Sequence, residues 1–167
     1  MLAELAARRL EASIALGVIV LDQVTKTLVR RALVLGDGVE VLPGFLDLTR
    51  VHNTGAAFGM LNTVDFPMKT VALSLVALAA LAGVAWYATT VPLGDRLARV
   101  GMAGVLGGAV GNLIDRATEG YVLDFVDAYW RGWHFWAFNV ADAAISVGVA
   151  LMVLDILGLG RRASHSL

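Results

Sequence analysis

Residues 138–148, Phe-Asn-Val-Ala-Asp-Ala-Ala-Ile-Ser-Val-Gly, open the last long apolar segment of the chain, which continues through residues 149–153. A carboxylate, Asp142, lies one turn into this segment, three residues after Asn139, so the two side chains share a helix face. A charge in a membrane helix is costly and usually faces a bundle interior, which makes Asp142 a candidate functional residue. The alternative is an N-terminal cap, with Asn139 as the capping residue and Asp142 near the positive end of the helix.

The composition favours an integral membrane protein with a single domain, residues 1–167. Of its 167 residues 58% are hydrophobic, and the mean hydropathy is +0.74. Soluble domains average about 45–50% apolar residues, and the excess here lies in long runs. The formal net charge of −1 gives no general attraction to nucleic acid. Cysteine is absent, which excludes disulfides, thiolate catalysis and cysteine-based metal sites.

Four segments are predicted to cross a bilayer, which takes about 20 helical residues. They are residues 12–31, 68–89, 97–113 and 138–157. The first follows a pair of arginines, as the apolar core of a signal peptide would. It is longer than such a core and carries polar residues, so we interpret it as a retained first span. We therefore expect a mainly helical protein with four transmembrane helices.

The third predicted span is short and rich in glycine. Gly104 with Gly108, and Gly107 with Gly111, form two overlapping G-x-x-x-G spacings. In lipid such spacings allow helix backbones to approach closely. We therefore interpret these glycines as packing residues, because the chain contains no G-x-x-x-x-G-K-[ST] phosphate-binding pattern.

The connection between spans one and two differs in composition from the connection between spans three and four. Residues 32–67, between spans one and two, alternate loosely around Leu46 and Leu48 and contain the turn signal Pro43-Gly44, which predicts a small β-rich element. The connection between spans three and four is rich in aromatic residues, which indicates an interfacial belt. These aromatic residues are Tyr129, Trp130, Trp133, Phe135 and Trp136.

The basic residues predict that both termini are cytoplasmic and that the β-rich element is extracytoplasmic. Four spans put both termini on one side of the membrane, together with Arg8, Arg9, Arg96, Arg99, Arg161 and Arg162. The other side carries Arg30, Arg31, Arg50, Lys69, Arg116 and Arg131. The counts are equal, but the first set lies in much shorter segments, where the positive-inside rule applies.

This topology brings the polar residues of the spans to one depth. Asp22 lies near the middle of the first span, and Lys26 lies about 6 Å farther out at 1.5 Å per residue. The outer ends of spans three and four carry Asn112, Asp115, Arg116, Asn139 and Asp142, and the two outer loops carry Asn53 and Asp124. All of these groups are therefore expected in the outer half of the membrane.

Some of these polar groups have an ionic partner nearby in the sequence. Asp22 and Lys26 are spaced i, i+4 and can pair on one helix face. Asp115 and Arg116 follow Asn112 at i+3 and i+4, which also predicts one shared face and structural pairing of the two charges. Burying one charge without its partner would be costlier than burying the pair, so we expect these groups to order the site.

Asp124 and Asp142 have no such cation nearby in the sequence. Two carboxylates held close together cannot both ionise easily, so one keeps a proton and the pair offers a general acid and a general base. Such a pair can activate water against an amide without a metal, a cofactor or a nucleophilic side chain. Competing chemistries are less favoured, because no histidine lies in a predicted span and the zinc motif H-E-x-x-H is absent.

Two other classes of protein remain as alternatives. A proton-coupled transporter or small channel would also bury charged residues, but would place polar groups at several depths along a path. Residues 71–85 of the second span contain only Ser74 as a polar residue, which disfavours such a path. A non-catalytic assembly factor would explain the glycine packing, but not two unpaired aspartates at one depth.

Five motifs in order along the chain resemble those of lipoprotein signal peptidase (signal peptidase II). They are Asp22-Gln23-Val24-Thr25-Lys26, Asn53-Thr54-Gly55-Ala56-Ala57-Phe58, Gly108-Ala109-Val110-Gly111-Asn112-Leu113-Ile114-Asp115-Arg116, Val122-Leu123-Asp124-Phe125 and Phe138-Asn139-Val140-Ala141-Asp142-Ala143. Each motif alone is weakly specific, but the five together are highly specific and cover essentially the whole chain.

The resemblance implies a bacterial aspartic endopeptidase with four spans in the cytoplasmic (inner) membrane. It implies removal of the signal peptide from prolipoproteins just before a diacylglyceryl-modified cysteine, with Asp124 and Asp142 as the catalytic pair. Substrate-binding and site-ordering roles would fall to Asn53, Gly55, Asn112, Arg116, Asn139, Asp22, Lys26 and Asp115. Globomycin-type inhibitors are expected in the same site, membrane lipid around the helices, and a monomer that needs no metal, cofactor or nucleic acid.

Overall fold

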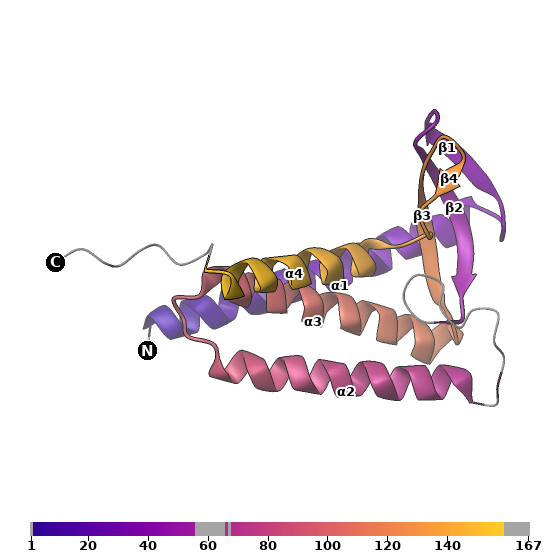
Figure 1. Ribbon diagram of the computed structural model, residues 1–167. Helices are drawn as coiled ribbons and strands as arrows, with labels where there is room; N and C mark the ends of the chain where they lie inside the picture. Colours follow the sequence, from indigo (N-terminus) through magenta and orange to yellow (C-terminus); the bar gives the residue numbers. More distant parts are fainter. Residues whose placement is uncertain (1, 56–65, 67, 159–167) are drawn as a thin grey trace.

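The computed structural model describes residues 2–55, 66 and 68–158, with side chains from residue 8 onward. Four helices form an elongated bundle: α1 (Leu2–Ala32), α2 (Lys69–Thr90), α3 (Arg96–Glu119) and α4 (Val140–Ile156). They run alternately toward and away from a small β-sheet at one end of the bundle (Figure 1). The start of α1 and the end of α4 therefore lie together at the opposite end.

Helix α3 is the central element, because it packs against each of the other three helices. Its glycines face two partners. A Cβ on Gly108 would collide with the carbonyl oxygen of Ala141 in α4, and one on Gly107 would lie 2.7 Å from the carbonyl oxygen of Ala15 in α1. The close helix packing predicted from the G-x-x-x-G spacings is therefore confirmed, with one spacing directed at each neighbouring helix.

Helix α3 extends beyond the predicted third span, which ends at residue 113, since the helix continues to Glu119. The prediction stopped where the sequence turns polar, but Asn112 and Asp115 are buried inside the bundle. Their hydrogen-bond partners come from other helices, so this end of the helix is polar without being exposed. Within the described part of the chain, three helical segments are long and apolar enough to cross a membrane: Arg8–Ala32, Lys69–Thr90 and Arg96–Glu119.

The sheet contains strands from two separate connections. Strands β1 (Gly38–Leu42) and β2 (Leu46–Asn53) lie between α1 and α2, while β3 (Val122–Trp130) and β4 (Trp133–His134) lie between α3 and α4. All four are antiparallel in the order β1-β2-β3-β4. The β-rich element predicted after the first span is confirmed, but the aromatic connection also forms strands, because β3 pairs along β2.

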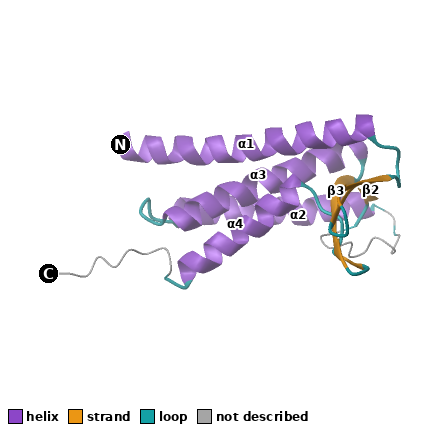
Figure 2. Cartoon of the chain, turned by 90° about the horizontal axis from the view of Figure 1, so that it is seen from above, coloured by secondary structure: helices purple, strands orange, loops and turns teal. Residues whose placement is uncertain are grey.

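The sheet joins the bundle through a small core. Val29 of α1 and Leu123 and Phe125 of β3 are buried together, with Leu48 and Val140 packed around them. Seen from above, β2 and β3 cross the ends of the helices rather than extending along them (Figure 2). Residues of the two middle strands are thereby held over the ends of α1, α3 and α4.

Candidate active site

Strand pairing brings Asn53 and Asp124 together. Asn53 is the last residue of β2, and Asp124 is the third residue of β3, opposite Val51. The Asn53 side chain donates a hydrogen bond from Nδ2 to Asp124 Oδ2 at 2.9 Å. We expected both residues in loops, and this was wrong: sheet pairing fixes both backbones, and Asp124 is only 2% exposed.

Asp142 lies in the first turn of α4, where it completes a capping box with Asn139. Asn139 Oδ1 accepts a hydrogen bond from the Asp142 backbone N–H at 2.9 Å, and the Asn139 N–H donates to Asp142 Oδ2 at 3.3 Å. The cap interpretation is therefore confirmed. Asp142 is more than a cap, since its Oδ1 accepts a hydrogen bond from Asn112 Nδ2 of α3 at 2.8 Å.

Asn139 also connects the two aspartates. Its Nδ2 donates to Asp124 Oδ1 at 2.8 Å, while its Oδ1 receives the Asp142 backbone N–H. The backbone of Phe138 pairs with Val126 of β3, at 2.8 and 3.0 Å, and this fixes where α4 begins relative to the sheet. A fully buried asparagine thus holds the start of α4 against the strand that carries Asp124.

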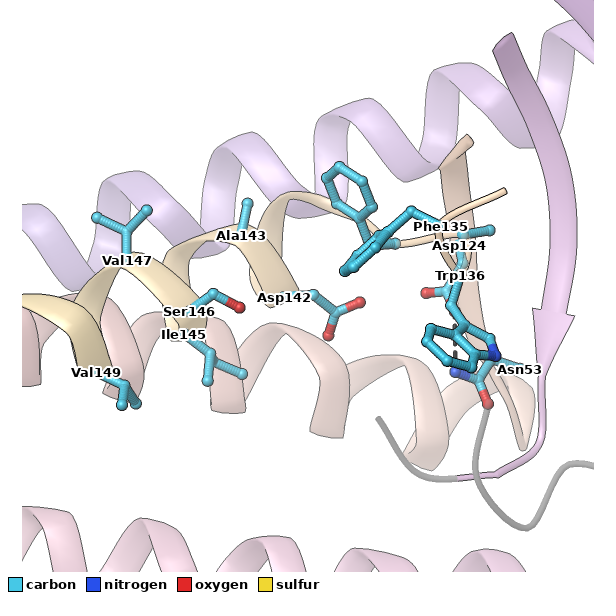
Figure 3. Close-up of a pocket in the computed structure, with 12 residues that line it drawn as sticks. Asn53, Asp124, Phe135, Trp136, Asp142, Ala143, Ile145, Ser146, Val147 and Val149 are labelled. Atoms are coloured by element: carbon cyan, nitrogen blue, oxygen red, sulfur yellow. Dashed lines mark hydrogen bonds between the residues drawn. The ribbon is translucent and has the colours of Figure 1, made fainter. Parts of the chain in front are cut away.

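Both aspartates line one cavity of about 540 Å³ that continues along α4 (Figure 3). Most of its other lining residues are apolar, and Phe135 and Trp136 border it near the sheet. Burial, reinforced by the charge of Asp142, raises the pKa of Asp124 from 3.8 to about 7, although hydrogen bonds from Asn53 and Asn139 act in the opposite direction. Asp124 is therefore suited to hold or release a proton near neutral pH.

A second cluster, formed by Asp22, Lys26 and Asp115, is joined to Asp142 through Asn112. Lys26 Nζ contacts Asp22 Oδ2 at 2.8 Å, Asp115 Oδ2 at 3.0 Å and Asn112 Oδ1 at 3.0 Å. Asp22, Lys26 and Asp115 are completely buried. The predicted Asp22–Lys26 pair is confirmed, and Asn112 joins this cluster to Asp142 because its amide oxygen accepts from Lys26 while its nitrogen donates to Asp142.

The predicted pairing of Asp115 with Arg116 is wrong. Adjacent residues on a helix point about 100° apart and do not face each other. Asp115 instead pairs with Lys26 and with Arg30 Nη2, both at 3.0 Å. Arg116 turns to the other side, where it feels the charges of Asp124 and Asp142 and its Nη2 donates to the Gly55 carbonyl oxygen at 3.1 Å.

Gly55 completes the set of predicted site residues. Its backbone N–H donates to Asn53 Oδ1 at 2.9 Å, and its carbonyl oxygen receives Arg116. The backbone of Gly55 is thereby tied both to the residue that binds Asp124 and to the arginine that faces the aspartates. The rest of this motif, residues 56–58, lies outside the described residues, as do Arg161 and Arg162.

A family model described as "Signal peptidase (SPase) II" matches residues 14–158. The chain belongs to the signal peptidase II family. A lipoprotein signal peptidase of Geobacter metallireducens is 47% identical over 149 residues, which cover 87% of this chain and 89% of the relative. One of Symbiobacterium thermophilum is 43% identical over 149 residues, covering 89% and 95% of the two chains.

Solved structures agree with this assignment. One, described as a bacterial membrane enzyme at 2.3 Å resolution, has a TM-score of 0.77 and 29% identity over 94% of each chain. A second such structure, at 1.9 Å resolution, gives a TM-score of 0.75 and 28% identity over 88% of this chain. Signal peptidase II is a peptidase of the bacterial inner membrane that cleaves prolipoprotein signal peptides, so the transporter and assembly-factor alternatives are set aside.

The structure also adds residues to the site that the sequence motifs did not assign. Arg30 completes the series Asp22, Lys26, Arg30 at i, i+4, i+8, a spacing that could have identified it, since all three lie on one helix face. Asp22 also accepts the Ala141 backbone N–H of α4 at 3.0 Å. No local sequence pattern predicts that contact, because it joins residues 119 positions apart.

Proposed function

We propose that Asp124 and Asp142 are the catalytic pair of an aspartic endopeptidase that cleaves prolipoproteins just before a diacylglyceryl-modified cysteine. The observation that carries this proposal is that two aspartates, from a strand and from a helix, line one cavity and are hydrogen-bonded to amide groups. Among the described residues, neither forms an ion pair with lysine or arginine. Each carboxyl group therefore keeps its ability to exchange a proton.

In the proposed reaction the pair carries one proton. The ionised carboxylate takes a proton from water as the water oxygen bonds to the scissile carbonyl carbon, and the protonated carboxyl donates to the amide nitrogen. The C–N bond then breaks, leaving a carboxylic acid on the signal peptide and a free amine on the cysteine. Asn53, Asn112 and Asn139 hold the two carboxyl groups in place throughout, and no metal takes part.

The proposed substrate is held by both its peptide and its lipid. The support is that the cavity at the aspartates is largely apolar and continues along α4, so an acyl chain could extend from the reacting end. The same cavity would accept globomycin-type inhibitors. We also propose that the protein acts as a monomer. Cleavage should depend on the diacylglyceryl group, and equal rates with and without it would contradict the substrate assignment.

We further propose four spans with both termini in the cytoplasm and the sheet outside. Helix α4 has 17 residues, or about 25 Å at 1.5 Å per residue, which is near the lower limit for a span. A reporter active only outside the cytoplasm should work when inserted at Gly44, in the β1–β2 turn, and fail at the C-terminus. The reverse pattern would overturn this topology.

The catalytic assignment is tested with a lipidated prolipoprotein and purified protein in detergent. Mass spectrometry should show a new amino terminus at the modified cysteine, unaffected by chelators. Asp124→Asn and Asp142→Asn should each nearly abolish cleavage, and the double variant should be little worse, because the two residues act as a unit. A folded single variant that cleaved at the wild-type rate would contradict the mechanism.

A further inference from the structure

A second cavity, of about 290 Å³, shares Asp142 with the first, whereas Asp124 lines the first cavity alone. Both are lined by Asn53, Asp142 and Ile145. From this shared point the first cavity follows α4 on the side of Ser146, and the second lies over α3 between α2 and α4. Ile145 therefore lies between two largely apolar grooves that both begin beside Asn53 and Asp142.

The groove over α3 has the shape and surface expected for a helix. Its α2 wall consists of Leu73, Val76, Ala77, Ala80, Leu81 and Val84, a stripe at the i, i+3, i+4, i+7 spacing of one helix face. Its floor on α3 includes Val105 and Ala109. Figure 1 shows α3 lying between α2 and α4, and among the described helices α2 packs mainly on α3. A helix in lipid satisfies its own backbone hydrogen bonds and needs only close apolar packing here.

The polar residues that line only the groove over α3, Asn112 and Arg116, lie at its end near Asp142, whereas the groove along α4 carries one hydroxyl group farther from the sheet. Ser146 follows Asp142 by one turn, about 6 Å farther from the sheet, and lines this cavity between apolar neighbours (Figure 3). Its hydroxyl makes no hydrogen bond with any other described residue. In the groove over α3, the lining residues that lie farther from the sheet than Asn112 and Arg116 are all apolar, so no side chain there can donate a hydrogen bond as Ser146 can. The groove along α4 therefore suits a part of the substrate that carries a hydrogen-bond acceptor close to the scissile bond.

We propose that the two grooves sort the substrate: the α4 groove takes the diacylglyceryl group, with Ser146 donating to an ester carbonyl, and the α2–α3 groove takes the signal helix. Ile145 is the partition between them. This inference rests on the proposed function. Ester carbonyls accept hydrogen bonds and lie within a few bonds of the modified cysteine, whereas a signal helix presents only apolar side chains to its groove.

The first experiment compares two lipidated prolipoproteins that differ only in the lipid linkage, a diacyl ester and a dialkyl ether of equal chain length. The ether lacks the carbonyl acceptors. Wild-type protein should cleave the ester with a kcat/KM about fivefold higher, the effect expected of one neutral hydrogen bond. Ser146→Ala should reduce this ratio to about one, and Ser146→Thr should restore it. Ser74→Ala is the matched control, since Ser74 donates only to the Thr70 carbonyl oxygen within α2.

The second experiment fills the other groove. Ala80→Leu adds bulk to the α2 wall and should lower the kcat/KM of both substrates about tenfold or more, leaving the ester-to-ether ratio and the preference for acyl length unchanged. Ala79→Leu is the control, because Ala79 is exposed and lies outside the lining of both cavities. Thermal unfolding should show that all variants remain folded.

The outcomes separate this inference from the proposed function. An unchanged ester-to-ether ratio in Ser146→Ala, with normal wild-type cleavage, would overturn the lipid assignment alone. A changed acyl-length preference in Ala80→Leu would place the lipid over α3 and overturn the sorting. Failure of wild-type protein to cleave either substrate would refute the proposed function and this inference with it.

Discussion

Two clusters of buried aspartates lie side by side in this protein and are stabilised differently. Asp22 and Asp115 contact the ammonium group of Lys26 at 2.8 and 3.0 Å, so their charges are compensated inside the bundle. Asp124 and Asp142 are instead held by the amide groups of Asn53, Asn112 and Asn139. Asn112 touches both clusters, accepting from Lys26 and donating to Asp142.

The two clusters illustrate two ways of holding a buried carboxyl group, by a cation or by amide groups. A carboxylate paired with a cation stays ionised and ties its helix to a neighbour. A carboxyl group bonded to amides can be oriented equally well, but its proton is not fixed by a counter-charge. We infer that the ion-pair cluster positions α1, α3 and α4, and that the amide-held pair carries out the chemistry.

The largest expected effect comes from making the same substitution in both clusters. Asp142→Asn should lower the cleavage rate by about 10⁴-fold while changing the free energy of unfolding by less than about 1 kcal/mol, because it removes one of two repelling charges. Asp115→Asn should instead lower the free energy of unfolding by about 3 kcal/mol, since Lys26 and Arg30 lose a partner. Cleavage assays and equilibrium unfolding in mixed micelles measure the two effects, and equal losses of stability would remove the distinction.

Lys26→Met should cause the next largest effect, on stability. It leaves Asp22 and Asp115 buried without their cation, which should cost about 3–5 kcal/mol. Adding Asp22→Asn should recover part of the loss, because one uncompensated charge is removed. Unfolding of the two variants in mixed micelles tests this, and a stable Lys26→Met protein would show that the ion pairs are dispensable.

The third prediction concerns pH. The pKa of Asp124 is about 7 in the folded protein against 3.8 in the unfolded chain, so between these values the folded state binds more protons. Its contribution to stability is present below pH 4 and is lost as the pH rises to 7, by roughly 3–4 kcal/mol. Asp124→Asn removes this loss and should become more stable than wild type as pH rises. Parallel unfolding curves for wild type and Asp124→Asn across this pH range would contradict the prediction.

The smallest effect is expected from Asn112→Ala, which cuts the link between the clusters. Lys26 and Asp142 each lose one hydrogen bond, so stability should fall by about 1–3 kcal/mol. The cleavage rate should fall by about 10- to 100-fold, because Asp142 loses the amide that orients it. Steady-state kinetics and unfolding of the same preparation test this, and wild-type kinetics would show that the clusters act independently.

Much of the helical bundle could be predicted from the sequence because apolar runs and glycine spacings are local patterns. The glycines at 104, 107, 108 and 111 indicated close packing, and each faces a neighbouring backbone or side chain. The length of α3 could not be predicted in this way. The predicted span ended at residue 113, and only the neighbouring helices supply the partners that bury Asp115 beyond it.

The candidate site residues could be selected by type and order, but the contacts that hold them in place could not be predicted. Asp124 was expected in a loop, whereas pairing of β3 with β2 holds it opposite Val51. Strands from connections far apart in the sequence form this sheet, so no local pattern predicted it. Asp115 was expected to pair with Arg116, its neighbour in the chain, and the fold directs the two side chains to different partners.

The sequence by itself determined the membrane class, most of the helical segments, the family resemblance and which polar residues are candidates for the site, because each rests on residue type and short-range spacing. The tertiary structure decided that Asp115 meets Lys26 and Arg30 rather than Arg116, and which amide groups hold Asp124 and Asp142. That distinction depends on contacts between α1, α3, α4 and β3, such as Lys26 with Asp115 and Asn139 with Asp124. Whether a buried carboxyl group stays ionised or exchanges a proton is set by the groups within a few ångströms of it, and folding brings those groups together from distant parts of the chain.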